Sequence, residues 1–461
     1  MKRLLILAAT ILVFASMASA QHAAIDSLMT RFNRTDAPGG AITVVQHGEI
    51  AFQSGYGMAS LEQGTAIRPE TIFDIGSVAK QFTGFALAVL DHRGLLSLDD
   101  AVRTHLPEIP DFGHSITIRH LLNHTSGLRE VYDAKSLSGW IGGDRIEQEE
   151  ALRLTRHMHE LNFEPGTEYL YCNTAYMLLA DVVARVTGQS FPEWMQEHVF
   201  DPLKMETAEI MDVPGEVIPG SADSYAPARG GGFVRTFDNS SAFGQGGIYA
   251  SGKDMARWLA NFGSMRVGGP EVFDRLTTRG ILASGDTLVY ALGISIREHR
   301  GAGVWLHTGA SAGFRSVLAW FPAFETGFFV QGNRADFNAV SVLWDVVDAV
   351  LGGQLAPQSP ETESPGTPDE DAAPPAFDAE EYEGRYFSPE LESVFAVVRM
   401  GDSLVLTHRR RGDMPMRVLE EDVFQAEGFG TLRFERDDAG AVTGYRVTTG
   451  RVRALRFSRF D

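Results

Sequence analysis

The sequence predicts an α/β fold of the α+β type, in which an antiparallel β-sheet is flanked by helices and carries an inserted, mostly helical lobe. A small all-β, barrel-like domain is predicted to follow it. Three observations support this: β-like runs stand at both ends of the first 350 residues, helical patterns fill the space between them, and short alternating runs follow a proline-rich segment.

The strands and helices of the large part follow from hydrophobic pattern. Residues 41–46 and 50–57 alternate around His47-Gly48 and predict a β-hairpin. A run rich in Ala, Leu and Phe predicts a helix over 77–90, with Gly94 just past its end. Further helices are expected at 118–122, 146–159, 174–186 and 340–351, and β-like runs at 289–297, 303–307, 314–321 and 326–333. Strands from both ends are therefore expected to share one sheet.

The chain divides into four segments. Residues 354–377 are rich in proline and acidic side chains, which cannot bury enough apolar surface to fold, so they predict a linker. The linker separates a domain over 21–353 from a small all-β domain over 378–461. Residues 1–20 combine Lys2 and Arg3 with a short apolar run and Ala18-Ser19-Ala20, the pattern of a cleaved signal peptide. We therefore expect a periplasmic or secreted protein with no stable membrane span after cleavage.

Composition narrows the classes of function. The net charge is −20, which disfavours nucleic acid as a partner. Cys172 is the only cysteine in the sequence, so no intrachain disulfide can form and a zinc site with several thiolates is excluded. The expected partner is a small-molecule or peptide substrate, and the sequence leaves the oligomeric state open.

Ser77 and Lys80 are the first candidate catalytic pair. Their spacing places both side chains on one helix face, one turn apart. A serine becomes a nucleophile when an adjacent base takes its proton, and a lysine with a lowered pKa can be that base. The four-residue pattern is common, so the prediction depends on partners elsewhere in the chain.

Two later motifs supply groups that this pair lacks. Tyr171 and Asn173 stand just before a predicted helix, where a phenol can move a proton and an amide can bind a substrate amide. His307-Thr308-Gly309 ends a predicted strand, and Gly309 would let a ligand approach the strand backbone. The N–H groups of Ala310 and Ser77 could then form an oxyanion hole.

The order S-x-x-K, Y-x-N and H-T-G resembles the serine β-lactamase and penicillin-binding-protein family, closest to its class C and D-alanyl-D-alanine-peptidase-like branch. That branch also includes esterases and D-aminopeptidases. The stretches 118–128, 201–205 and 246–252 match it as well, and the small β-domain resembles domains appended to such hydrolases. The resemblance implies a β-lactamase/transpeptidase-like fold and a serine hydrolase that works through an acyl-enzyme.

The resemblance also implies roles for the candidate residues. Ser77 would be the nucleophile, and Lys80 and Tyr171 would share the base and acid roles, with the first proton acceptor left open. Asn173 and His307 would bind substrate beside Gly309 and Ala310, and His307 would support Tyr171. No metal or organic cofactor is implied.

His307 departs from relatives that carry lysine at this position. A histidine is largely neutral at pH 7, so it would not hold a substrate carboxylate as a lysine does. We therefore expect an exported hydrolase of esters or of amide and peptide bonds of D-amino acids, with weak or no β-lactamase activity. The alternative is a non-catalytic protein that binds or senses cell-wall peptides on the same scaffold.

Other motifs have simpler interpretations. Ser311 lies in a G-x-S-x-G pattern, but a β-like run follows it, so we expect a hairpin turn. His120 and His124 have the spacing of a metal pair but lack a third ligand, and a structural role is expected. Cys172 is expected to be a buried packing residue. A loop of the small β-domain is expected to cover or narrow the cleft.

Overall fold

A computed structural model describes residues 19–357, 377–401 and 403–460. Most of the predicted signal segment and most of the predicted linker lie outside these residues, so both stay predictions. The described chain forms two compact units. The first combines residues 19–96, 187–280 and 289–357, and the second combines 97–186, 281–288 and 377–460. The second unit therefore contains both the helical insertion and the C-terminal domain.

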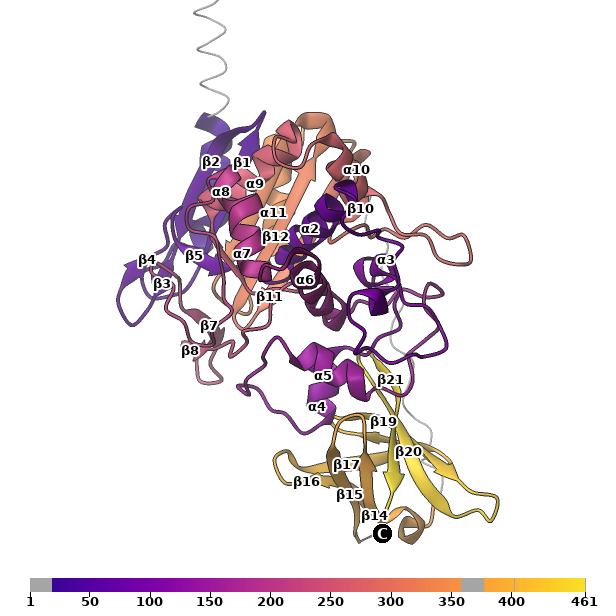
Figure 1. The fold of residues 1–461 in the computed structure, drawn as a ribbon. Coiled ribbons are helices and arrows are strands. Elements are labelled where there is room, and N and C mark those ends of the chain that lie inside the picture. Colours follow the sequence, from indigo (N-terminus) through magenta and orange to yellow (C-terminus); the bar gives the residue numbers. More distant parts are fainter. Residues whose placement is uncertain (1–18, 358–376, 402, 461) are drawn as a thin grey trace, which may run out of the picture. The chain divides into compact units, whose positions relative to one another are not determined.

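The first unit is built on an antiparallel sheet with the strand order β10-β11-β12-β13-β1-β2 (Figure 1). β1 pairs with β13 so that Ile42 lies opposite Val330, which confirms that the sheet draws strands from both ends of this part. His47 and Gly48 have φ of 50° and 82° in the β1–β2 turn, a conformation typical of tight hairpins. The strands are β1 (Gly40–Gln46), β2 (Glu49–Tyr56), β10 (Ser295–His299), β11 (Ala302–Ser311), β12 (Phe314–Phe321) and β13 (Thr326–Gly332).

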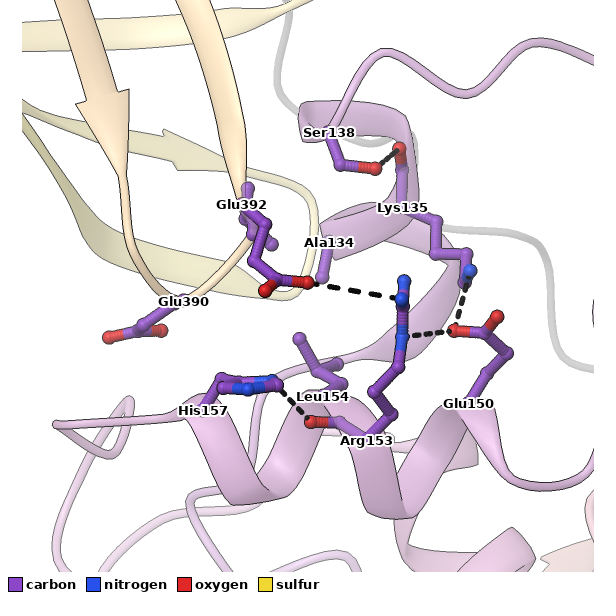
Figure 2. Close-up of a pocket in the computed structure, with 10 residues that line it drawn as sticks. Ala134, Lys135, Ser138, Glu150, Arg153, Leu154, His157, Glu390 and Glu392 are labelled. Carbon is purple, nitrogen blue, oxygen red and sulfur yellow. Dashed lines mark hydrogen bonds and ion pairs between the residues drawn. The ribbon is translucent and has the colours of Figure 1, made fainter.

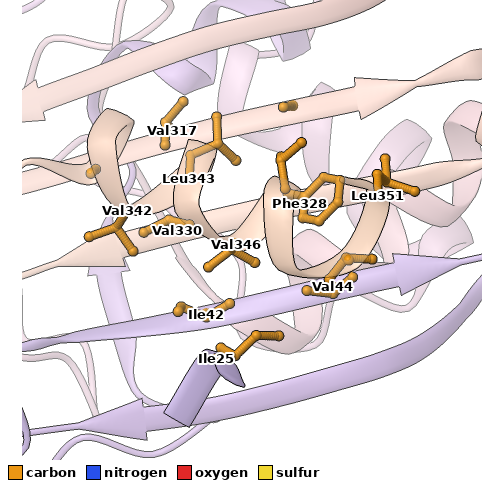
Figure 3. Packing of buried hydrophobic residues seen from close by; sticks show 14 of the residues in the cluster. Ile25, Ile42, Val44, Val317, Phe328, Val330, Val342, Leu343, Val346 and Leu351 are labelled. Carbon is orange, nitrogen blue, oxygen red and sulfur yellow. The ribbon is translucent and has the colours of Figure 1, made fainter. Parts of the chain in front are cut away.

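Helices cover both faces of this sheet. On one face, α11 (Ala339–Leu351) and the helical residues 19–29 bury their apolar side chains against the strands, as Figure 3 shows for Leu343, Val346 and Ile25. On the other face, α9 (Gly252–Ser264) packs against β1 and β13. There Trp258 stacks on Phe82 of α2 (Lys80–His92), with 4.3 Å between ring centroids. This second face positions α2, which begins at Lys80.

Shorter elements complete the first unit. They are η1 (Thr30–Phe32), β3 (Met58–Ser60), β4 (Thr65–Ala66), β5 (Ile72–Asp74), η2 (Gly76–Ala79), α7 (Phe191–Met195), the π-helical turn η4 (Gln196–Phe200), α8 (Asp201–Leu203), β6 (Glu209–Ile210), β7 (Ser224–Pro227), β8 (Phe233–Thr236), β9 (Ile248–Ser251), α10 (Pro270–Thr277) and η5 (Pro322–Phe324).

The second unit contains helices and a closed barrel. The helical elements are η3 (Val102–Thr104), α3 (Ile118–Leu122), α4 (Val131–Leu137), α5 (Glu150–His157), α6 (Asn173–Thr187) and η6 (Ala379–Tyr382). Each barrel strand pairs with the next and β14 also pairs with β21, which closes the barrel. The strands are β14 (Gly384–Ser388), β15 (Ser393–Met400), β16 (Ser403–His408), β17 (Gly412–Glu420), β18 (Val423–Ala426), β19 (Gly430–Arg436), β20 (Val442–Thr449) and β21 (Val452–Arg459).

The predicted fold class is confirmed, with differences in detail. α3 matches its predicted range, whereas α5 is shorter than the helix expected over 146–159. The predicted strand over 289–297 is wrong in its first half, because Gly293 has φ of +85° and the regular strand begins only at Ser295. No helix among the described residues is both long and apolar enough to cross a membrane.

Candidate active site

Ser77 and Lys80 lie at the start of one continuous helical segment. The 3₁₀ turn η2 holds Ser77 and runs directly into α2, whose first residue is Lys80. Lys80 Nζ lies 3.2 Å from Ser77 Oγ and donates a hydrogen bond of 2.6 Å to the carbonyl oxygen of Gln245. The Lys80 side chain is fully buried. The expected contact across one helical turn is therefore confirmed, and a buried amine stands beside the serine hydroxyl.

The turn that carries Ser77 is fixed from two sides. Asp74 Oδ1 accepts a 2.8 Å hydrogen bond from the N–H of Gly76, and Ser316 Oγ donates a 2.7 Å bond to the carbonyl of Ile75. Burial and, to a smaller extent, the negative charge of Asp238 raise the pKa of Asp74 to about 7. Neither Asp74 nor Ser316 was predicted as a site residue, although Asp74 lies three positions before the serine.

β11 runs directly against this turn. A Cβ added at Gly76, which has φ of +52°, would lie 2.7 Å from the backbone nitrogen of Ala310. A Cβ at Gly309 would lie 2.2 Å from the carbonyl oxygen of Ile75. The close approach expected at Gly309 is thus made by the chain itself. Ser77 stands in a first helical turn, where N–H groups have no helical partner, next to the strand that carries Ala310.

His307 is a buried and uncharged residue of β11. Its Nδ1 lies 2.7 Å from the carbonyl oxygen of Thr308, which can only accept, so Nδ1 carries the proton. Nε2 therefore accepts the 2.9 Å hydrogen bond from the hydroxyl of Tyr290. Burial and, to a smaller extent, the positive charge of Lys80 lower the pKa of His307 to about 3. At neutral pH this position carries no positive charge.

The segment before β10, which contains Tyr290, departs from strand geometry at Gly293. A Cβ at Gly293 would lie 2.3 Å from the carbonyl oxygen of Lys80, and one at Gly84 would lie 1.9 Å from that of Leu292. Two glycines thus let this segment pack on the start of α2. The alternating pattern of residues 289–297 predicted a strand, so this packing on α2 was not expected from the sequence.

Tyr171 and Asn173 lie in the second unit, at the start of α6. The backbone N–H and Nδ2 of Asn173 donate to the two carboxylate oxygens of Glu130, at 2.5 and 2.8 Å. The Glu130 side chain is fully buried, which raises its pKa, while the positive charge of Arg451 acts in the opposite direction. A carboxylate at a helix N-terminus is favourable. Glu130 was not predicted, because no local pattern connects it to Asn173.

The neighbours of Tyr171 have structural roles. The Tyr171 ring lies 4.3 Å from that of His124 and 5.8 Å from the guanidinium carbon of Arg451. His124 Nδ1 accepts the N–H of Cys172, whereas His120 bonds Thr117 in the cap of α3. Burial raises the pKa of the Cys172 thiol to about 12, as suits a packing residue.

The predicted site residues divide between the two units. The first unit brings Ser77 to Lys80 and places Gly309 and Ala310 against the Ser77 turn, with His307 on the same strand. The second unit holds Tyr171 and Asn173, one on each side of Cys172. Ser311 lies at the β11–β12 turn, as predicted, and donates to Asp238 Oδ2 at 2.6 Å.

A small charged pocket in the second unit contains no predicted site residue (Figure 2). It is lined by α4, α5 and the β14–β15 connection. Glu150 pairs there with Lys135 at 2.7 Å and with Arg153 at 3.2 Å. These charged side chains of the pocket thus form ion pairs with one another. Among the described residues, no group of three or more His, Cys, Asp or Glu side chains is placed to hold a metal ion.

Comparison with known proteins identifies the family of this chain. The model of the Beta-lactamase family matches residues 23–351. D-aminopeptidases of Brucella canis and Brucella anthropi are 31% and 32% identical over 316 residues, which are 68% of this chain and 60% and 59% of theirs. The chain thus spans about three fifths of the length of these curated relatives.

Solved structures show the same fold. The octameric penicillin-binding protein homologue from Pyrococcus abyssi superposes with a TM-score of 0.63 at 23% identity, over 95% of this chain and 98% of that one. A D-stereospecific amidohydrolase from Streptomyces sp. gives a TM-score of 0.57 at 21% identity, over 72% and 99% of the two chains. At these identities the likeness concerns the fold.

Proposed function

Since the chain belongs to the Beta-lactamase family, we propose that it is a serine hydrolase that cleaves amide, peptide or ester bonds of D-amino-acid substrates through an acyl-enzyme on Ser77. Export from the cytoplasm, which residues 1–20 predict, is part of the same proposal. The 31% sequence identity to D-aminopeptidases over 316 residues supports D-amino-acid compounds as the substrate class.

The proposed reaction uses groups whose chemistry suits each step. Ser77 Oγ attacks the substrate carbonyl carbon while its proton passes to a base, a role that Lys80 and Tyr171 share. The amine or alcohol departs with a proton and leaves an ester on Ser77. Water then attacks this ester, releases the acid and restores the serine. The N–H groups of Ser77 and Ala310 bind the oxyanion, and Asn173 binds the substrate amide or ester group.

The observation that carries the substrate preference is the state of His307. It is buried, its tautomer is fixed by Thr308 and Tyr290, and its pKa of about 3 keeps it neutral. A carboxylate gains most from a positively charged donor. With a neutral histidine here, we infer that substrates whose binding depends on a free carboxylate, including β-lactams, are poorly used.

A substrate panel tests this proposal. The mature protein is assayed with D- and L-alanine p-nitroanilide, p-nitrophenyl acetate and the chromogenic cephalosporin nitrocefin, with Ser77→Ala as the blank. We expect kcat/KM for the D-alanine anilide to exceed that for the L-alanine anilide by about 10²-fold or more, because the site binds the substrate amide in one orientation. The kcat/KM for nitrocefin should stay below about 10⁴ M⁻¹s⁻¹, the lower end of the range typical of enzymes.

Two results would contradict the proposal. One is a nitrocefin kcat/KM inside the usual enzymatic range, because that would show that a neutral His307 does not limit β-lactam use. The other is equal turnover of the D- and L-anilides, because that would remove the stereochemical part of the proposal.

A further inference from the structure

The C-terminal barrel contacts the segment that leads into Tyr171 and Asn173, within the second unit. β20 and β21 form a hairpin whose turn contains Gly450 and Arg451. A Cβ at Gly450, which has φ of +49°, would lie 2.7 Å from Asp133 Oδ2. The same oxygen accepts hydrogen bonds from the backbone N–H of Arg451 at 2.8 Å and from its Nε at 3.2 Å. The turn is thus anchored on α4.

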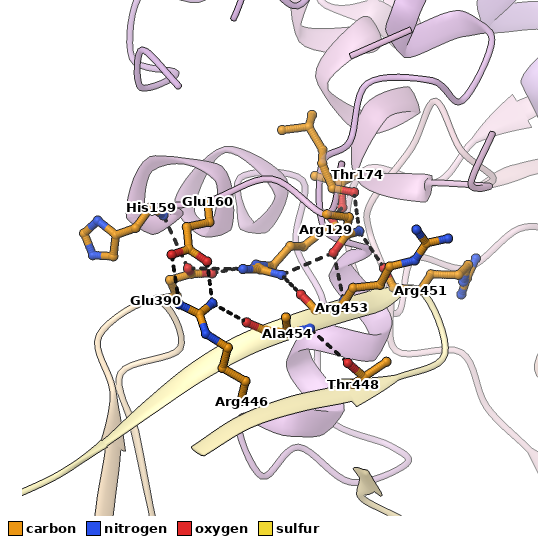
Figure 4. Close-up of polar contacts among 12 residues, drawn as sticks. Arg129, His159, Glu160, Thr174, Glu390, Arg446, Thr448, Arg451, Arg453 and Ala454 are labelled. Carbon is orange, nitrogen blue, oxygen red and sulfur yellow. Dashed lines mark hydrogen bonds and ion pairs between the residues drawn. The ribbon is translucent and has the colours of Figure 1, made fainter. Parts of the chain in front are cut away.

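Two adjacent residues of opposite charge, Arg129 and Glu130, form ion pairs with the barrel. Arg129 is fully buried and its Nε lies 2.8 Å from Glu390 Oε2, while Glu130 Oε1 lies 3.4 Å from Arg451 Nη2. Arg129 also donates to the carbonyl oxygen of Arg453 at 2.5 Å (Figure 4). Each charge of the Arg129-Glu130 dipeptide therefore meets the opposite charge from the barrel.

The same dipeptide holds the segment around Tyr171. The carbonyl oxygen of Arg129 accepts a 2.7 Å hydrogen bond from Thr174 Oγ1 (Figure 4), and the Glu130 carboxylate accepts both N–H donors of Asn173. The guanidinium of Arg451 also faces the Tyr171 ring, at 5.8 Å from its centroid. A chain of contacts thus runs from the barrel turn to both residues of the Y-x-N motif.

We propose that Arg451 of the C-terminal barrel is a positioning residue that holds Tyr171 and Asn173 in their working orientation, through Glu130 and through the Tyr171 ring. This inference rests on the proposed function, because it assigns work to Tyr171 and Asn173. It gives the barrel a part in the reaction that does not require the barrel to touch substrate.

The electrostatics of Glu130 show why a cation matters here. A fully buried carboxylate without a partner takes up a proton instead of keeping its charge. The charged or titratable groups that act on Glu130 are Arg451 from the barrel, Asp133 from α4 and the Cys172 thiol beside Asn173. Arg451 is the cation among them. Its removal would raise the pKa of Glu130 further.

This direction predicts how activity depends on pH. Once protonated, Glu130 is a weaker acceptor for the two donors of Asn173, so the motif loosens as pH falls. Without Arg451 this loosening starts at a higher pH. The acidic limb of kcat/KM is therefore expected to move to higher pH in Arg451→Met.

The test compares Arg451→Met with Arg453→Met, a control on the same hairpin. Arg453 Nη1 pairs with Glu168 at 2.7 Å, so its loss also removes an ion pair between the barrel and the helical part. We expect Arg451→Met to lower kcat/KM by about 10–100-fold, as a small misplacement of reacting groups does. Arg451→Lys should recover most of this loss, and Arg453→Met should stay within about twofold of wild type.

A second readout does not depend on activity. Hydrogen exchange of the peptide that contains Asn173 should be faster in Arg451→Met than in Arg453→Met, because the Asn173 N–H is bonded to Glu130. Equal exchange in the two variants, together with equal kcat/KM and an unmoved acidic limb, would overturn the inference. A wild-type protein that turns over no substrate would refute the proposed function, while the exchange comparison would still decide the role of Arg451.

Discussion

Replacing Lys80 with methionine is expected to lower kcat/KM by about 10²–10⁴-fold, the usual contribution of a positioned proton acceptor or donor. Lys80 Nζ lies 3.2 Å from Ser77 Oγ and the side chain is fully buried. A lysine on the surface therefore cannot take over its role. Methionine fills a similar volume without the amine, which separates the loss of proton transfer from the loss of packing.

The control for Lys80→Met is Lys253→Met, which removes an exposed lysine from α9 that pairs with Glu70. This control should keep wild-type kcat/KM. Circular dichroism and urea unfolding should show that Lys80→Met folds. If folded Lys80→Met stays within tenfold of wild type, the amine does not act on the proton of Ser77.

Arg129→Met is expected to lower the free energy of unfolding by about 3–5 kcal/mol, the usual cost of removing one partner of a buried ion pair. The variant leaves the carboxylate of Glu390, which is 6% exposed, without its cation. It also removes the 2.5 Å hydrogen bond to the carbonyl oxygen of Arg453. Urea unfolding followed by tryptophan fluorescence and circular dichroism measures the change.

A second substitution separates the buried charge from the loss of packing. Arg129→Met combined with Glu390→Met should recover much of the lost stability, because two apolar side chains replace the pair without leaving a charge. Arg433→Met is the exposed control, since Arg433 and Glu420 pair in solvent at 66% and 62% side-chain exposure, and it should cost less than about 1 kcal/mol. If Arg129→Met costs no more than this control, the buried pair does not stabilise the unit.

The sequence predicted what local patterns encode. The contact of Ser77 with Lys80 follows from their spacing on a helix, and the β1–β2 hairpin follows from alternation around His47-Gly48. The barrel was expected from the short alternating runs that follow the proline-rich segment, and its strands pair in sequence order.

The residues that surround the candidate site could not be predicted in the same way. Glu130 binds Asn173 across 43 residues of sequence, and Gln245 accepts from Lys80 across 165. Contacts of this kind depend on how elements pack and leave no periodic signal. The role of Gly309 shows the same limit: a glycine reveals that something approaches closely, and only the fold shows that it is the carbonyl of Ile75.

The most direct measurement of the central claim is the intact mass of the mature protein after reaction with a fluorophosphonate, followed by peptide mapping. A serine hydrolase that forms an acyl-enzyme on Ser77 should gain one adduct per chain, on the peptide that contains Ser77, and Ser77→Ala should gain none. An adduct that persists in folded Ser77→Ala, or a wild-type protein that hydrolyses substrate but gains no adduct, would contradict the account.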